Sequence, residues 1–128
     1  VANDPIYIFH ILGGASQWEG RSAGSIFSEG GTNFLAFTSD GTTTRMYMNS
    51  EVVAVADNIG ANAGQWMGDA TDCNVYSLAA MRRAALTIPY FGVMQKNIIY
   101  DRALTQLELQ QIYSRGFGPN GPRWYPDH

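Results

Sequence analysis

Residues 98–116, IIYDRALTQLELQQIYSRG, decide how this chain folds. The stretch predicts the end of a strand, then a tight corner and one short helix. Thr105 and Glu108 have the T-x-x-E spacing of a capping box, in which each side chain accepts a hydrogen bond from the other residue's backbone amide. Leu104 and Leu109 stand at the two positions of a hydrophobic staple across the same helix start. We therefore predict a helix that begins directly after Thr105.

The other end of this helix is marked by a cation and a glycine. Arg115 followed by Gly116 is typical of a helix C-terminus. Leu109, Ile112 and Tyr113 recur at spacings of three and four residues and form one apolar stripe. Because the rest of the chain predicts strands, this stripe is expected to pack on a sheet.

Composition limits the class of protein. With 128 residues, 45% of them hydrophobic and 15% charged, the chain is long enough for one domain with a core and too apolar for disorder. The net charge is -3 and Lys96 is the single lysine, which argues against a nucleic-acid partner.

Cys73 is alone, so no intrachain disulfide forms. No segment approaches the ~18 apolar residues of a membrane span. The start at Val1 suggests a processed product or part of something longer.

Short apolar segments predict seven or eight strands separated by turns. Asp40-Gly41 and Asn49-Ser50 are turn signals, and Gly13-Gly14 ends the first strand. That first strand is nearly continuously apolar, so we expect it to be covered on both faces. The predicted strands are residues 6–12, 25–27, 33–39, 44–48, 52–56, 74–79, 84–88 and 91–100. Many short strands predict an antiparallel sandwich, capped by the helix.

The remaining segments predict loops. Residues 15–24, small and polar around Trp18, are expected to be one loop, and residues 57–72 a second, longer one. Loops of that length are often functional. His10, inside the first strand, is expected to be a core histidine rather than a ligand. We assign residues 1–116 to the sandwich and residues 117–128 to an irregular tail rich in proline and glycine.

Two motifs resemble the laminin G-like, concanavalin A-like family of jelly-roll domains. The first is the hairpin of residues 37–54, FTSDGTTTRMYMNSEVVA, and the second is the corner YDRALT at residues 100–105, with Glu108 and Tyr113 after it. The match covers roughly residues 33–116. The resemblance implies an all-β, antiparallel jelly-roll sandwich with one short C-terminal helix.

The chain departs from the family pattern in three places. Ser50 replaces the usual turn glycine, so Asn49 is expected to carry more of the positive φ. Asn97 replaces an apolar strand residue, and its amide would need partners if it faced inward. Only about 35 residues precede the match, whereas the family opens with strands that complete both sheets. We hypothesise that another segment or chain supplies them.

Catalysis is not expected. Glycosidases need two carboxylates across a cleft, and some enzymes of this fold carry them as a Glu-x-Asp-x-x-Glu run, which this sequence lacks. Glu108 belongs to the capping box. The two histidines, His10 and His128, support no Ser-His-Asp arrangement. We therefore predict a protein that is not an enzyme and requires no cofactor, with calcium as an open alternative.

Binding is more plausible, because relatives of this fold bind sugars or proteins through rim loops, sometimes with calcium. An aromatic face beside polar oxygens suits a sugar, and the candidate ligand-binding residues are Trp66, Asp69, Asp72, Asn74 and Tyr76. Calcium prefers several oxygen ligands, and the candidates for it are Asp57, Asn58, Asp69 and Asp72. Trp66 as plain core filling is the alternative. Trp124 and Tyr125 are candidate assembly contacts, unless they fold back on the sandwich.

The sequence thus predicts a non-catalytic recognition module for carbohydrate binding or adhesion, in a larger secreted, cell-surface or virion protein. Its partner would be a glycan or a protein, and it would belong to an oligomer or larger assembly. The alternative is a structural assembly module, such as a phage or viral decoration or fibre domain, whose sheets neighbouring chains complete.

Overall fold

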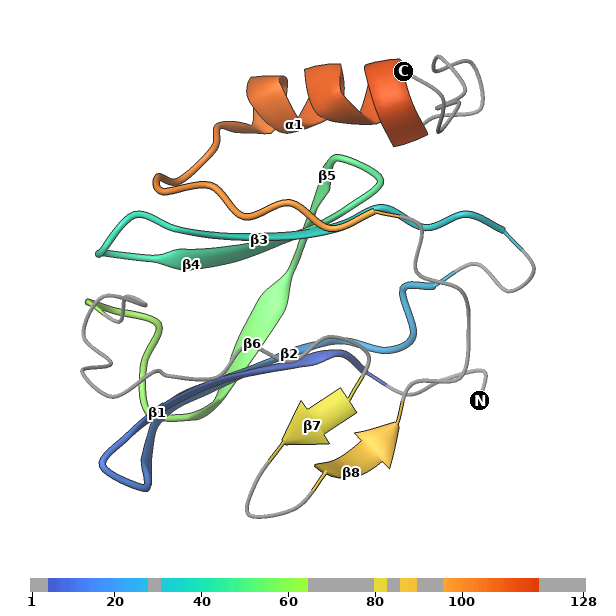
Figure 1. Ribbon diagram of the computed structural model, residues 1–128. Coiled ribbons are helices and arrows are strands. Elements are labelled where there is room, and N and C mark those ends of the chain that lie inside the picture. The colour runs from blue at the N-terminus through green and yellow to red at the C-terminus, as the bar shows by residue number, and fades with distance from the viewer. Residues whose placement is uncertain (1–4, 28–30, 65–79, 83–85, 90–95, 118–128) are drawn as a thin grey trace.

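The computed structural model describes residues 5–27, 31–64, 80–82, 86–89 and 96–117. Within these ranges the chain is mostly β, with antiparallel sheets of order β1-β2-β6, β3-β4-β5 and β7-β8 and one short α-helix, as predicted. Figure 1 shows α1 above the β3-β4-β5 sheet and the β1-β2-β6 sheet below it. The elements are β1 (Tyr7–Leu12), β2 (Ala15–Ser22), β3 (Leu35–Ser39), β4 (Thr44–Met48), β5 (Glu51–Val53), β6 (Val55–Ile59), β7 (Ala80–Arg82), β8 (Leu86–Pro89), α1 (Gln106–Ile112) and the π-helical turn η2 (Tyr113–Phe117).

The β4–β5 hairpin forms where its turn signal predicted. Met48 pairs with Glu51, so the turn has two residues. Asn49 has a φ of 50° and Ser50 a φ of 69°, as a type I′ turn requires. Asn49 also accepts a hydrogen bond on Oδ1 from the Phe34 amide at 2.9 Å, which ties the turn to the start of β3. Contrary to expectation, Ser50 carries a positive φ of its own as well, without the freedom of glycine.

The strand after this turn does not run unbroken, as we predicted for residues 52–56. It divides at Ala54: β5 pairs with β4, whereas β6 pairs with β2. The chain therefore passes from one sheet to the other at this residue (Figure 1). Strand β6 also continues to Ile59, so residues 57–59 belong to a strand and not to the predicted loop. The polar Asp57 and Asn58 gave no strand signal, and the strand that they pair with, β2, lies almost forty residues earlier in the chain.

Residues 15–24 are not a loop, and most of them form β2, the central strand of its sheet. Gly13 and Gly14 have φ values of 58° and 80° and form the two-residue turn between β1 and β2. Trp18 is fully buried. Gly20 provides the space for it, because a Cβ at that position would overlap the indole ring. Burial of Trp18, rather than strand propensity, explains why this small, polar segment forms a strand.

Strand β1 is covered on one face only, which corrects the expectation of a strand buried on both. Tyr7, Phe9 and Ile11 are 42%, 48% and 54% exposed. The alternate residues Ile8 and His10 are half-buried, and His10 is paired with Trp18. The sequence of β1 is almost continuously apolar, but one face of the sheet that contains β1 is exposed to solvent.

Other boundaries differ from prediction. Residues 25–27 form no strand, and residues 96–100 are irregular where the end of a strand was expected. Asn97 is exposed, so its amide is not buried there. Residues 81–82 belong to β7 instead of a connection, and Pro89 closes β8. The predicted strand at residues 74–79 lies outside the described residues. Gly116 lies within η2 and does not follow the last helical residue, because the helix continues as a wider turn.

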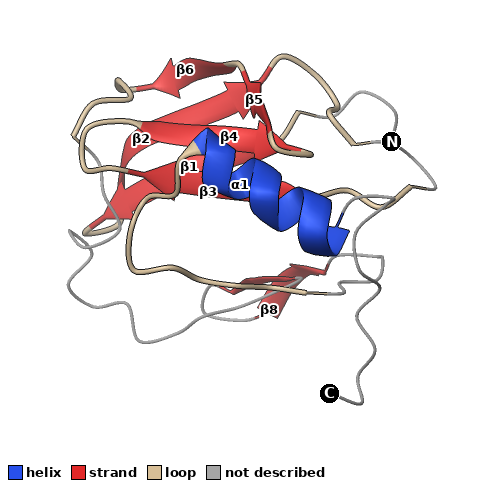
Figure 2. Ribbon diagram, turned by 90° about the horizontal axis from the view of Figure 1, so that it is seen from above, coloured by secondary structure: helices blue, strands red, loops and turns tan. Residues whose placement is uncertain are grey.

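The helix packs on the sheet as its apolar stripe predicted. Leu104 and Leu109, the two staple positions, form a buried cluster with Tyr47 of β4. Half-buried Phe34, Ala36 and Ile112 surround this cluster, and Tyr113 stacks on Phe34 with ring centroids 5.8 Å apart. Figure 2 shows α1 lying across β3 and β4. Each buried leucine stabilises this contact by roughly 1.5–3 kcal/mol, so Leu104, just before the helix, and Leu109, within it, hold the helix to the sheet.

Candidate functional site

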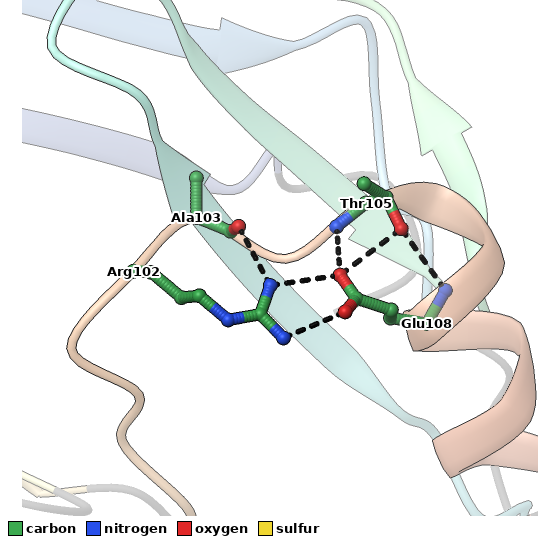
Figure 3. A network of polar contacts seen from close by, with 4 residues as sticks. All are labelled: Arg102, Ala103, Thr105 and Glu108. Atoms are coloured by element: carbon green, nitrogen blue, oxygen red, sulfur yellow. Dashed lines mark hydrogen bonds and ion pairs between the residues drawn. The ribbon is translucent and has the colours of Figure 1, made fainter.

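The helix begins with the predicted capping box (Figure 3). The Glu108 amide donates to Thr105 Oγ1 at 3.3 Å, and the Thr105 amide donates to Glu108 Oε2 at 2.8 Å. The Thr105 hydroxyl lies 3.0 Å from the same carboxylate oxygen. Both residues are therefore held in fixed positions, and the corner before the helix has one geometry.

Arg102 holds the same carboxylate from the opposite side. Its Nη1 donates to Glu108 Oε2 at 3.0 Å, and its Nη2 donates to Oε1 at 2.6 Å, a two-pronged ion pair (Figure 3). The guanidinium, with the Thr105 amide, lowers the pKa of Glu108 to about 2. Glu108 raises the pKa of Arg102 in return. At neutral pH Glu108 thus carries no proton that it could give to a substrate.

A shallow pocket lies beside this ion pair and has a volume of about 210 Å³. Leu104 and Ile112 contribute apolar surface, and Gln111 and Arg115 contribute hydrogen-bond donors. The lining residues are Tyr100, Arg102, Leu104, Glu108, Gln111, Ile112 and Arg115. Sequence reasoning missed this site. The signal was present, because Glu108, Gln111, Ile112 and Arg115 follow the i, i+3, i+4, i+7 spacing of one helix face.

The calcium candidates Asp57 and Asn58 hold β6 to β2. Trp18 Nε1 donates to Asp57 Oδ1 at 2.7 Å, and Asn58 Nδ2 donates to Glu19 Oε1 at 2.6 Å. The Asn62 amide lies 3.4 Å from Asp57 Oδ2. No group of three or more His, Cys, Asp or Glu side chains suited to a metal occurs in the part of the chain that the structure describes.

The other predicted site residues lie outside the described part of the chain. They are Trp66, Asp69, Asp72, Asn74 and Tyr76, together with the assembly candidates Trp124 and Tyr125. Sugar and calcium binding by the 57–76 region therefore stays a prediction.

Asp40 forms a second carboxylate network at the β3–β4 turn. Its Oδ1 accepts from the amides of Thr42 and Thr43 at 2.9 and 2.7 Å, and its Oδ2 pairs with Arg45 at 2.7 Å. The Arg45 guanidinium and the two amides hold the pKa of this carboxyl well below its usual range. The network fixes the turn, so Asp40 is a structural residue.

Comparison with known proteins gives one informative likeness. No family model matches the chain, and no curated protein matches it. The crystal structure of an S-layer domain-containing protein from Clostridium thermocellum superposes on 88% of this chain with a TM-score of 0.51 and 18% sequence identity. At this identity the likeness concerns the fold alone. The chain spans 63% of the length of that structure.

No helix among the described residues is both long enough and apolar enough to cross a bilayer.

Proposed function

We propose that the chain is a non-catalytic recognition module with a laminin G-like jelly-roll sandwich, and that it belongs to a surface-associated protein. One observation carries the proposal: the outer face of β1 presents Tyr7, Phe9 and Ile11 to solvent. The Tyr7 and Phe9 rings stack with centroids 5.9 Å apart and planes 15° apart. Exposed, ordered apolar side chains of this kind mark interaction surfaces.

The carboxylates support a binding role over a catalytic one. Glu108, Asp40 and Asp57 each accept hydrogen bonds from their own chain, and these bonds fix a helix cap, a turn and a strand pair. A catalytic pair would need carboxylates that face each other across a cleft. The three groups belong to separate parts of the fold and serve its stability.

Carbohydrate is the ligand class that we propose for the β1 face. Sugar sites combine an apolar surface for the ring with polar groups for the hydroxyls. Tyr7 pairs across the sheet with Arg21, and paired residues share one face. Arg21 is exposed. The stacked rings and this guanidinium together supply both kinds of contact.

The surface location rests on the structural comparison. The neighbour of similar fold is described as an S-layer domain-containing protein. We carry over only the general role of a surface-associated module, which agrees with the location expected from the sequence.

A second candidate function is structural assembly. Within the described residues, β1 is one of the two edge strands of its sheet, and an edge strand can pair with a further strand. The S-layer domain-containing structure is also longer than the part that matches this protein, because the match covers 63% of its length. Both observations favour the hypothesis that another segment or chain completes the sandwich.

A glycan array on the full chain, with calcium and with chelator, tests the two candidates. Phe9→Ala probes the β1 face, Trp66→Ala probes the predicted loop, and Val52→Ala is a control for another exposed apolar side chain. Carbohydrate recognition at the β1 face requires binding that Phe9→Ala abolishes and Val52→Ala retains. An array without binding, together with self-association that Phe9→Ser disrupts, would favour assembly. A monomer that binds no glycan would contradict both.

A further inference from the structure

We propose that the pocket lined by Tyr100, Leu104, Gln111 and Arg115 is a second binding site, distinct from the β1 face, and that it takes a carboxylate-bearing sugar ring, such as a uronic acid. The proposal goes beyond recognition by the β1 face. It rests on the geometry of the helix and of the corner before it. These elements are held together by the capping box and by the Arg102–Glu108 ion pair, so the pocket is preformed.

The charges in the pocket leave one cation in excess. Arg102 and Glu108 neutralise each other through their two-pronged contact. Arg115 is exposed, and it forms no ion pair with any residue that the structure describes. It lies in the last helical turn, where a cation is favoured by the helix dipole. That interaction occupies none of its directed N–H groups, and no carboxylate of the described residues engages the fork of the guanidinium, whose geometry matches a carboxylate ligand.

The neighbouring polar groups suit a sugar hydroxyl. Glu108 Oε2 accepts from Arg102, from the Thr105 amide and from the Thr105 hydroxyl, whereas among the described residues Oε1 accepts from Arg102 alone. A carboxylate oxygen has two lone pairs, so Oε1 retains acceptor capacity for a hydroxyl. The Gln111 amide adds a donor and an acceptor at the same rim.

The apolar surface and the size of the pocket suit one ring. Leu104 is buried and Ile112 half-buried, and together they give the lining an apolar part. Tyr100, 44% exposed, adds an aromatic ring. At about 210 Å³, the pocket is smaller than the roughly 300–1,000 Å³ of sites that enclose drug-sized ligands. It therefore fits one terminal residue of a larger glycan.

The acceptor-only carboxylate of Glu108 selects among anions. Inorganic phosphate presents mainly acceptor oxygens, which cannot hydrogen-bond to Glu108 Oε1, itself an acceptor. A monoanion places its one charged group at Arg115 and turns neutral hydroxyls toward Glu108. The pocket is thus expected to prefer a sugar acid over both a neutral sugar and inorganic phosphate.

Titration of the full chain, followed by NMR chemical shifts, tests the proposal. The probes are methyl β-D-glucuronide, methyl β-D-glucoside and inorganic phosphate, at low and at high salt. We expect the glucuronide to bind at least tenfold more tightly than either other probe, and its binding to weaken as salt screens the guanidinium. Equal binding of the glucoside, or tighter binding of phosphate, would overturn the proposal.

Two arginine variants locate the binding. Arg115→Gln should weaken glucuronide binding at least tenfold. Lys96→Gln, which removes an exposed cation from outside the pocket lining, should leave it unchanged. Glucuronide binding that Arg115→Gln leaves unchanged and Arg21→Gln abolishes would overturn this inference while leaving recognition at the β1 face intact. A far-UV circular dichroism spectrum of each variant confirms that the fold is retained, and Arg115→Lys, which keeps the charge without the fork, should give an intermediate affinity.

Discussion

The indole nitrogen of Trp18 donates a 2.7 Å hydrogen bond to the carboxylate of Asp57, and the two residues lie thirty-nine positions apart in the chain. The bond joins β2 to β6 just after the chain has returned from the β3-β4-β5 sheet to the β1-β2-β6 sheet. It is a contact between a fully buried donor and a charged acceptor. Hydrogen bonds to charged groups contribute about 1.5–3 kcal/mol, more than neutral ones.

Trp18→Phe should therefore lower the free energy of unfolding by at least about 2 kcal/mol, because it removes the donor and also leaves unfilled space. Urea denaturation of parent and variant measures the difference. Asp57→Asn is the matched control: it keeps an acceptor oxygen and should cost less. Equal stability of Trp18→Phe and the parent would show that the hydrogen bond does not hold the two strands.

Gly20→Ala should destabilise the protein by about 1–3 kcal/mol, the usual cost of overfilling a packed site. A Cβ at this position would overlap the Trp18 ring and meet the Val55 side chain at 2.6 Å. Gly24→Ala is the control, since no atom lies within 4 Å of its Cβ position and its φ is not positive. Thermal melting of both variants tests the difference, and a Gly20→Ala variant as stable as Gly24→Ala would contradict the packing described here.

Ser50→Gly should stabilise the protein by roughly 0.5–1 kcal/mol. A non-glycine residue at positive φ costs about 1–2 kcal/mol, and the extra chain entropy of glycine offsets part of the gain. Ser50→Ala keeps the unfavourable φ of 69° and should bring no gain. If chemical denaturation finds Ser50→Gly less stable than the parent, the buried Ser50 hydroxyl contributes more stability than the positive φ of serine costs.

The Arg102–Glu108 pair should make stability depend on pH. The pKa of Glu108 is about 2 in the folded protein, against an ordinary value of 4.5. The unfolded chain therefore binds the proton more readily as pH falls, and the contribution of the carboxylate, complete above about pH 5, is lost between about pH 4.5 and pH 2.

Glu108→Gln isolates this effect, because glutamine can still form the capping box. Urea midpoints at pH 7, 4 and 2 should show the parent more stable than the variant at pH 7, with the difference vanishing at pH 2. Asp40→Asn, which removes the other carboxylate of lowered pKa, controls for acid sensitivity elsewhere. If the urea midpoints of the parent and of Glu108→Gln differ by the same amount at all three pH values, the charge of Glu108 does not stabilise the fold.

The features predicted correctly from sequence are those that neighbouring residues determine. The capping box needs only Thr105 and Glu108, and the hairpin turn only Asn49 and Ser50. Strand β2 was missed because Trp18 and Gly20 make it a strand through packing, which periodicity does not reveal. The glycine pair at 13–14 was the available signal, since two glycines between strands favour a type I′ turn.

The crossing at Ala54 and the pocket beside α1 depend on spatial arrangement. The run from Val52 to Ala56 has the pattern of one strand, and nothing in it shows that its halves pair in different sheets. The pocket combines a helix face with the corner before it, and only the fold brings Tyr100 next to Gln111 and Arg115. The spacing of apolar residues in the helix identified the stripe that faces the sheet. It did not show that the adjacent face of the helix lines a pocket.

The contact of Leu109 with Tyr47 has a consequence for synthesis of the chain. The cluster joins residues about sixty positions apart. At roughly 5–20 residues per second, a ribosome needs several seconds after Tyr47 to add the helix that covers it. During this interval β3 and β4 leave the exit tunnel before the helix is made, so Tyr47, Phe34 and Ala36 are still exposed to solvent. Because its apolar surface stays exposed until α1 emerges and docks, we expect the nascent hairpin to bind a holding chaperone in this interval.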